Sequence, residues 1–216
     1  MNVHLDKIFP TPIWYADLDI DNKELYHWCK KFQEIDRDGA SKSNMNGWHS
    51  KDIVLEEYFH VNPVRDLFFA IMEMANQAAT DYNYVNTNKT IKIANAWINV
   101  NDTKESYNET HVHPNTTFSG AYYVKCNENS GSICFERNFY ERFLFHCYGT
   151  IDKPNELSAD GKWYRPLEGR LLLFPSYLPH SVNNNLDDSE RVSMSFNVDY
   201  SGWNTYNVHG KQNIIY

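Results

Sequence analysis

The chain has 216 residues, 42% of them hydrophobic and 15% aromatic, with a formal net charge of −8 at pH 7. This length suits a single domain with a substantial core. The acidic balance and the absence of a Lys/Arg cluster argue against a nucleic-acid partner, because phosphate binding needs a basic face. The sequence has no signal-peptide pattern and no apolar run of membrane-spanning length, so we expect a cytoplasmic, intracellular protein with no membrane partner.

The four cysteines, Cys29, Cys126, Cys134 and Cys147, have no zinc-like spacing. A chain of this length does not need disulfides to fold, so we expect reduced thiols. The alternative is a disulfide between Cys126 and Cys134, which could approach each other across a hairpin.

The first 90 residues predict an edge strand and two helices. Residues 8–18 have an extended, proline-containing pattern that suits an edge strand. Apolar residues at helical spacing predict an amphipathic helix from Asp21 to Asp36. A second helix is expected to begin with Asn62 as N-cap and Pro63 at the first helical position. We expect both helices to buttress a sheet, and the polar residues 37–50 to form a loop.

After about residue 90 the pattern changes to short β-like runs separated by turn-forming residues. Many short strands without intervening helices predict a sandwich or a barrel. The predicted strands are Ile91–Val100, Phe118–Lys125, Ser132–Arg137, Arg170–Phe174 and Arg191–Tyr200.

One connecting segment, residues 138–165, is unusually long. Long segments in compact domains are often functional, so we expect it to cover a site. Together with the loop at residues 39–50, it is the expected wall of a substrate pocket. Its aromatic residues include Tyr140, Phe143, Phe145 and Tyr148.

The clearest chemical signal is the pair His111 and His113, which lies in strand-like sequence. Residues i and i+2 of a strand point to the same face, so the two imidazoles should project together. A further histidine, His180, lies far along the chain. A close pair with one distant ligand is a pattern by which a β-barrel can assemble a metal site, although a single strand histidine is more often structural.

Arg191 and Ser193 follow His180 and should share one face of the last strand. A guanidinium fork and a hydroxyl at that spacing could hold a carboxylate. The alternative for Arg191 is a surface salt bridge with Glu190 or Asp188.

The order of these motifs resembles the iron(II)- and 2-oxoglutarate-dependent oxygenases, among them members from bacteria and from tailed phages of marine bacteria. The resemblance spans residues 95–197. It also implies that the cell in which the protein acts could be a phage-infected host. No single motif is diagnostic, and the resemblance rests on the ordered set. The motifs are His111-x-His113, Ser119-Gly120-Ala121-Tyr122-Tyr123-Val124, Gly169–Pro175, His180 and Arg191-x-Ser193, with Phe9–Pro12 and Gly47–Ser50 as weaker matches.

The resemblance implies a mainly β fold with flanking α-helices, a cupin-like double-stranded β-helix or jelly roll. We expect one domain over residues 1–216. Residues 1–90 would supply the N-terminal strand and buttressing helices, residues 91–200 the double-stranded β-helix, and residues 201–216 a C-terminal tail.

The resemblance also implies a dioxygenase of the hydroxylase type with Fe(II), 2-oxoglutarate and O2 as cofactors. Oxidative decarboxylation of 2-oxoglutarate would be coupled to oxidation of an unknown substrate, either a small molecule or a protein side chain. His111 and His180 would hold the iron. Arg191 and Ser193 would bind the distal carboxylate of 2-oxoglutarate with help from Tyr123. Asn99 and Tyr122 are weaker candidates for the pocket.

The chain departs from the common pattern at one ligand. That pattern has two histidines and one carboxylate, and here His113 occupies the position of the carboxylate. Either His113 is the third ligand or a carboxylate such as Glu109 reaches the metal. We favour His113, because its spacing matches.

Two other functions remain open from the sequence. One is a three-histidine cupin-type metalloenzyme that uses no 2-oxoglutarate, and the other is a non-catalytic jelly-roll binding module. A homodimer is also expected, because edge strands can pair between copies.

Overall fold

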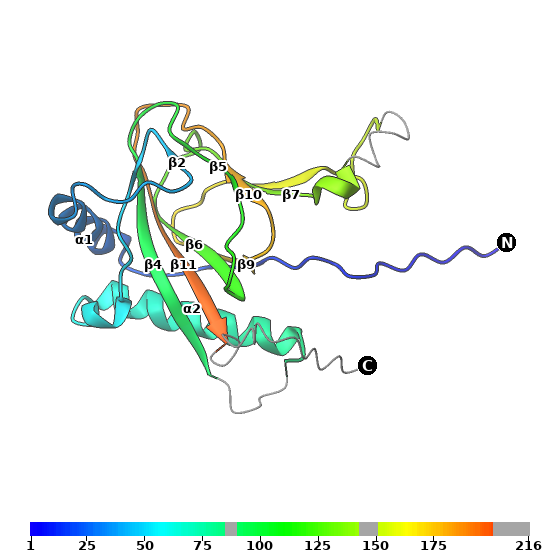
Figure 1. The fold of residues 1–216 in the computed structure, drawn as a ribbon, viewed down its shortest axis with the longest axis horizontal. Coiled ribbons are helices and arrows are strands. Elements are labelled where there is room, and N and C mark those ends of the chain that lie inside the picture. The colour runs from blue at the N-terminus through cyan, green and yellow to red at the C-terminus, as the bar shows by residue number, and fades with distance from the viewer. Residues whose placement is uncertain (85–89, 143–150, 201–216) are drawn as a thin grey trace, which may run out of the picture.

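The computed structural model describes residues 1–84, 90–142 and 151–200, which form two facing antiparallel sheets with helices on one side (Figure 1). The expected mainly β jelly roll with flanking helices is thereby confirmed. The residues of the predicted C-terminal tail, 201–216, lie outside the described residues.

The larger sheet has six strands in the order β1-β9-β6-β11-β4-β3, and the smaller has five in the order β2-β5-β10-β7-β8. Neighbouring strands in both sheets run antiparallel. The six strands are β1 (Trp14–Asp17), β9 (Arg170–Pro175), β6 (Phe118–Lys125), β11 (Arg191–Tyr200), β4 (Ile91–Asn101) and β3 (Trp48–His49). The five are β2 (Asn44–Met45), β5 (Tyr107–His111), β10 (His180–Val182), β7 (Ile133–Glu136) and β8 (Gly161–Tyr164).

The N-terminal region supplies helices and sheet edges. Helix α1 (Asn22–Ile35) begins where predicted, with the Asp21 carboxylate accepting a hydrogen bond from the Glu24 N–H at 2.9 Å. Helix α2 (Asn62–Asp81) has Val61 at its N-cap, so the predicted cap at Asn62 was wrong by one residue. A short 3-10 helix, Leu55–Tyr58, precedes it. As predicted, β1 is an edge strand.

Two predicted connecting segments contain additional strands. Residues 37–50 include β2 and β3, each at the edge of one sheet, instead of forming only a loop. Residues 138–165 include β8, which pairs with β7. The remaining aromatic candidates of that segment, Phe143, Phe145 and Tyr148, lie outside the described residues.

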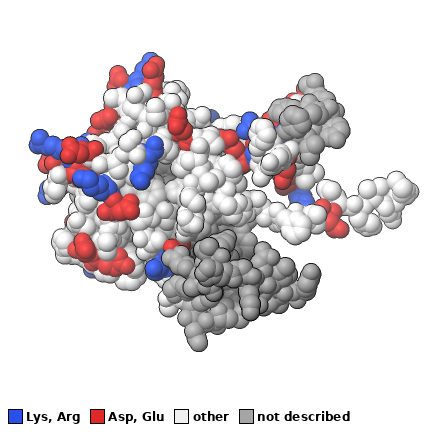
Figure 2. Space-filling view, viewed as in Figure 1, with Lys and Arg blue, Asp and Glu red and all other residues white. Residues whose placement is uncertain are grey.

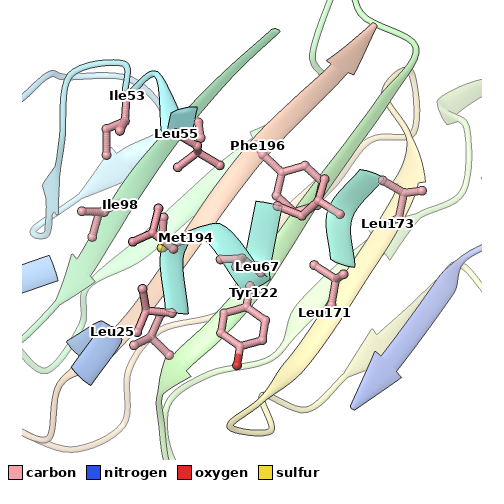
Figure 3. Packing of buried hydrophobic residues seen from close by; sticks show 14 of the residues in the cluster. Leu25, Ile53, Leu55, Leu67, Ile98, Tyr122, Leu171, Leu173, Met194 and Phe196 are labelled. Atoms are coloured by element: carbon pink, nitrogen blue, oxygen red, sulfur yellow. The ribbon is translucent and has the colours of Figure 1, made fainter. Parts of the chain in front are cut away.

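The six-stranded sheet has an apolar outer face that packs against the helices. Because side chains alternate along a strand, Tyr122, Met194 and Phe196 all point to this face. They join one buried cluster with Leu25 of α1 and Leu67 of α2 (Figure 3). The amphipathic helices therefore cover the sheet as expected, and they leave its other face for the interior of the jelly roll.

Charged residues of both signs are interspersed on the face shown in Figure 2, consistent with the lack of a basic cluster in the sequence. Among the described residues, no helix combines the length and apolar character that crossing a membrane requires. Cys29, Cys126 and Cys134 form no disulfide in the described part of the chain, and Cys147 lies outside the described residues. The reduced state of the thiols stays a prediction.

Gly120 gives a direct test of the contact between β6 and its neighbours. A Cβ atom at this position would lie 2.2 Å from Phe196 Cζ and 2.4 Å from the Leu172 carbonyl oxygen. We expect Gly120→Ala to lower the free energy of unfolding by about 1–3 kcal/mol, because the close-packed neighbours have to move. Urea unfolding followed by circular dichroism measures this change.

Gly161→Ala on the edge strand β8 is the matched comparison. Its added Cβ would meet the Phe135 carbonyl oxygen at 3.0 Å, which a small shift relieves. A loss of stability at Gly161 equal to that at Gly120 would contradict the packing described here.

Candidate metal centre

Three histidines from two segments of the chain meet inside the jelly roll. His111 ends β5, His180 begins β10, and the two residues are paired across the antiparallel strands. His113 lies just beyond the end of β5, where its main-chain N–H donates to the Ser176 carbonyl oxygen at 2.9 Å. The ring centroids are 4.3 Å apart for His111 and His180, and 5.1 Å apart for His113 and either of the others.

The main chain determines which nitrogen of two of these rings is free. His111 Nδ1 lies 2.6 Å from the Glu109 carbonyl oxygen, and His180 Nδ1 lies 2.9 Å from that of Leu178. A carbonyl oxygen can only accept, so each Nδ1 carries the proton and each Nε2 keeps its lone pair. Both rings are therefore in the tautomer that binds a metal through Nε2.

The distance between His113 and His180 fits a shared metal ion. Their Nε2 atoms are 3.3 Å apart. Two histidine nitrogens that each lie about 2.0–2.1 Å from one metal, at roughly a right angle, are about 3 Å apart. The three histidines can offer ligand atoms that all lie within 4.8 Å of one another. The site therefore suits a metal without any change in the main chain.

Desolvation keeps the three imidazoles in their ligand form. Burial lowers the pKa of His180 to about 3 and that of His113 to about 4, with neighbouring His111 adding to both shifts. Burial also lowers the pKa of His111. All three rings are thus neutral near pH 7, and a metal does not have to displace protons from them.

No carboxylate among the described residues joins the three histidines as a close ligand group. Glu109, the alternative ligand considered from the sequence, has an exposed side chain and is not among the residues that line the cavity. Asp52 does line the cavity, but as an exposed residue. The geometry therefore supports His113 over Glu109 at the position of the missing carboxylate.

The histidines open into a cavity of about 450 Å³ that both sheets line. The inner face of the six-stranded sheet contributes polar side chains to it, whereas the outer face packs against the helices. This volume is within the range of sites for small molecules. The inner-face residues of β4 and β11 are Asn95, Trp97, Asn99, Arg191, Ser193, Ser195 and Asn197.

Arg191 lies buried in this cavity wall without a carboxylate partner among the described residues. It is 2% exposed and donates through Nη1 to the carbonyl oxygens of Ser130 and Gly131. Glu190, its alternative partner from the sequence, instead binds Lys30 at 2.7 Å and Lys125 at 3.4 Å. Burial lowers the pKa of Arg191 to about 10, so the guanidinium is still charged at neutral pH.

The other predicted pocket residues lie on both faces of the six-stranded sheet, three toward the cavity and one toward the helices. Ser193, Tyr123 and Asn99 line the cavity together with Arg191. Asn99 donates through Nδ2 to Ser195 Oγ at 3.0 Å, and its buried Oδ1 has no hydrogen-bond partner. Tyr122 was wrongly placed in the pocket. It points to the helices, where its hydroxyl donates to Asn22 Oδ1 at 2.7 Å.

The two segments predicted to wall a substrate pocket differ in whether they reach the cavity. Lys42, Ser43 and His49 from the 39–50 loop line the cavity, whereas no described residue of segment 138–165 does. Tyr140 is 77% exposed. Asn95 and Trp97 also line the cavity but were not predicted to. Asn95, Trp97 and Asn99 alternate along β4, and this period of two places all three side chains on one face.

His49 and Trp97 were also missed as neighbours of the histidines. The His49 ring stacks on Trp97 with a centroid distance of 5.5 Å, and Trp97 stacks on His113 at 5.6 Å. His49 belongs to the weak motif at Gly47–Ser50, but the sequence contains no sign that this segment pairs with β4.

The fold and the site together define a double-stranded β-helix protein with three convergent histidines and a buried arginine in its barrel. Residues 95–197 match the sequence profile of the family described as "Putative 2OG-Fe(II) oxygenase". The matched segment contains all three histidines and Arg191, and the resemblance noted from the sequence is thereby confirmed. No curated protein sequence matches the chain.

Solved structures share this fold at low sequence identity. A prolyl-4-hydroxylase from Pseudomonas putida has 10% identity and a TM-score of 0.55, with 88% of this chain and 93% of that chain covered. HygX from Streptomyces hygroscopicus, solved with nickel and 2-oxoglutarate, has 12% identity and a TM-score of 0.54, with coverages of 89% and 84%. The epimerase SnoN of nogalamycin biosynthesis has 10% identity and a TM-score of 0.57, with coverages of 88% and 76%.

The depressed histidine pKa values predict how the stability of the metal-free protein depends on pH. An unfolded histidine has a pKa of about 6.5, and folded His180 has a pKa of about 3. Between these values the unfolded state binds more protons, so stability falls as the pH falls. Each histidine that stays neutral in the fold contributes a slope of up to about 1.4 kcal/mol per pH unit.

Urea unfolding of wild type and His180→Asn in the presence of a chelator, from about pH 7 to about pH 5, measures this slope. We expect a shallower dependence in His180→Asn, because its side chain does not titrate. Equal slopes in the two proteins would contradict a neutral, desolvated His180.

Proposed function

We propose that the protein is an Fe(II)/2-oxoglutarate-dependent dioxygenase of the hydroxylase type. The observation that carries this proposal is the buried Arg191 guanidinium, which lacks a carboxylate partner among the described residues and lines the same cavity as the three histidines. A buried charge without a counterion is costly, so the cavity favours a ligand that brings an anionic group to Arg191.

His111, His113 and His180 would hold the iron(II), each through a neutral imidazole nitrogen. The proposed cofactors, Fe(II), 2-oxoglutarate and O2, supply oxidative decarboxylation of 2-oxoglutarate to succinate and carbon dioxide, coupled to oxidation of the substrate. The chain's own contribution is to hold the metal, orient the two organic molecules and restrict water inside the barrel.

Arg191 would bind the distal carboxylate of 2-oxoglutarate as a charged fork, with Ser193 and Tyr123 as further donors. Asn99 can assist if its amide is turned over. The amide NH2 group then replaces the unpartnered oxygen and can donate to a carboxylate, while the amide oxygen accepts from the Ser195 hydroxyl. The low dielectric of the cavity strengthens these contacts.

The substrate would occupy the part of the cavity walled by Trp97, His49 and the loop with Lys42 and Ser43. The stacked rings of His49 and Trp97 give this wall a flat aromatic surface next to His113. We propose an organic substrate, either a small molecule or a protein side chain. The hydroxylase type is part of the proposal, since the similar structures include an epimerase and a carbocyclase.

The metal assignment predicts that His111→Ala and His180→Ala abolish stoichiometric binding of iron(II) or cobalt(II), because each removes one of three ligands. Elemental analysis of untagged protein after dialysis measures the occupancy. His113→Asp should keep the metal, because a carboxylate there recreates the two-histidine, one-carboxylate set.

Glu109→Gln is the control for this series and should bind as much metal as wild type, because its carboxylate is exposed and does not belong to the ligand group. Full metal occupancy in His180→Ala would contradict the assignment of His180 as a ligand. Loss of metal in Glu109→Gln with retention in His113→Ala would make Glu109 the third ligand.

The assignment of Arg191 and Ser193 to the distal carboxylate predicts that Arg191→Ala weakens 2-oxoglutarate binding by on the order of a hundredfold or more. Each hydrogen bond to a charged group contributes roughly 1.5–3 kcal/mol, and about 1.4 kcal/mol corresponds to tenfold in affinity. Ser193→Ala should cost about tenfold by the same reasoning. Titration calorimetry of the manganese-loaded protein under nitrogen measures both, and neither change should release the metal.

Arg170→Ala is the matched control, since this arginine already binds the Asp17 carboxylate through contacts of 2.7 and 2.9 Å. Its loss should leave 2-oxoglutarate affinity unchanged. If wild type fails to bind 2-oxoglutarate, or Arg191→Ala binds it equally well, the oxygenase proposal falls.

A three-histidine cupin-type metalloenzyme without 2-oxoglutarate is the second candidate, and the all-histidine ligand group favours it. It would still bind metal in the first experiment but not 2-oxoglutarate in the second. A non-catalytic jelly-roll module would bind neither. Homodimer formation, a cytoplasmic location and the single-domain division of the chain stay predictions from the sequence.

A further inference from the structure

His49 is a cavity-lining histidine that belongs neither to the three-histidine group nor to the carboxylate pocket at Arg191. Its Nδ1 lies 2.6 Å from the Ser50 carbonyl oxygen, so Nδ1 carries the proton and Nε2 keeps its lone pair. No described residue forms a hydrogen bond with this Nε2 atom. The side chain is only 5% exposed, and a buried acceptor without a partner is costly. The cavity wall therefore offers an acceptor to a ligand that brings a donor.

The position of His49 in the sheet separates it from the proposed carboxylate pocket. Tyr123, Ser193, Asn99 and His49 are paired side by side across β6, β11, β4 and β3, and all four line the cavity. Neighbouring strands lie about 4.8 Å apart, so the His49 main chain is about 10 Å from that of Ser193. The free Nε2 thus belongs to the edge of the sheet, on the side proposed for the substrate.

The segment that follows β3 brings a carboxylate to the same edge. The Ile53 N–H donates to the Ala96 carbonyl oxygen at 2.8 Å, so residues 49–53 continue beside β4. Ile53 packs into the core, whereas Asp52 lines the cavity. Asp52 is exposed, and no salt bridge joins it to another described residue. His49 and Asp52 therefore place two hydrogen-bond acceptors on one edge of the cavity.

Two acceptors, one of them charged, favour a ligand group that has several donors and a positive charge. A protonated amine has three N–H donors and no acceptor. A hydroxyl group has one O–H donor and cannot donate to both residues, and a carboxylate would be repelled by Asp52. Lys42 also lines the cavity and has the same charge as an amine, but its side chain is exposed and can extend into solvent.

We propose that the substrate is an amine, and that His49 and Asp52 bind its ammonium group. One N–H donates to His49 Nε2, and a second donates to the Asp52 carboxylate. The carbon skeleton then lies along Trp97, whose ring contacts both His49 and His113, and so leads toward the three histidines. The inference rests on the proposed function and names the substrate class for the same cavity.

The test uses benzylamine and benzyl alcohol as probes, since they share a ring and differ in the ammonium group. Each is titrated into the full-length protein without metal, because an amine can bind a metal directly. The readout is the NMR resonance of the Trp97 indole N–H, which is assigned by its loss in Trp97→Phe. We expect benzylamine to bind at least about tenfold more tightly than benzyl alcohol, since hydrogen bonds to charged groups are the stronger ones.

Substitutions at the two acceptors separate their contributions. His49→Phe keeps a ring beside Trp97 but has no acceptor, and it should weaken benzylamine binding by about tenfold. His49→Gln supplies an amide oxygen and should recover most of this loss. Asp52→Asn should cost about threefold, a smaller effect because the carboxylate is exposed. Lys42→Met is the matched control of opposite charge and should not weaken binding.

Several results would overturn the proposal. Equal affinity of wild type for the two probes excludes recognition of the ammonium group, as does the absence of any benzylamine effect on Trp97. Wild-type affinity in folded His49→Phe, or no recovery in folded His49→Gln, contradicts the role of the His49 acceptor, and circular dichroism shows that each variant is folded. Equal losses in Asp52→Asn and Lys42→Met contradict the role of Asp52. Failure of wild type to bind 2-oxoglutarate is a separate result, because this titration needs neither metal nor co-substrate.

Discussion

The six-stranded sheet has to satisfy two unlike environments, and the rest of the structure depends on this constraint. One face is dry and packs against α1 and α2, whereas the other lines a polar cavity. Because successive side chains of a strand point to opposite faces, β11 can place Met194 and Phe196 against the helices and Ser193 and Asn197 in the cavity. A one-residue shift in register would exchange the two sets and destroy both the core and the site.

The cavity combines neutral metal-binding groups with an uncompensated positive charge. Burial keeps the histidines neutral, so they can bind a cation without first losing protons. The same burial leaves Arg191 with carbonyl dipoles but without a described carboxylate partner. Such a site favours the joint binding of a metal and an anion. The metal binds the neutral histidine nitrogens, and the anion balances the buried charge of Arg191. This joint requirement is the physical basis of the proposed co-substrate.

Local patterns were enough to predict both helices and the strands β1, β4, β6, β7, β9 and β11, but not the edge strands β2, β3 and β8. They also predicted that His111, His113, His180 and Arg191 come together. These features depend on period-2 or helical spacing and on the order of motifs along the chain. Sequence alone could not place His49 beside Trp97, because that contact depends on β3 pairing with β4 across about fifty residues. The error at Tyr122 has a similar origin. Tyr122 and Tyr123 have the same chemistry, and only the sheet's orientation decides which one reaches the cavity.

The histidine at position 113 changes the charge of the proposed centre and therefore what its surroundings must supply. Three imidazoles leave a divalent metal one unit more positive than two imidazoles and a carboxylate would. No carboxylate among the described residues lies close enough to join the ligand group, so compensation from the chain has to act through weaker dipoles. A neutral ligand set of this kind attracts cations less strongly by electrostatics, and the metal-loaded centre should depend more on anionic 2-oxoglutarate to complete the charge balance than a carboxylate-containing site does.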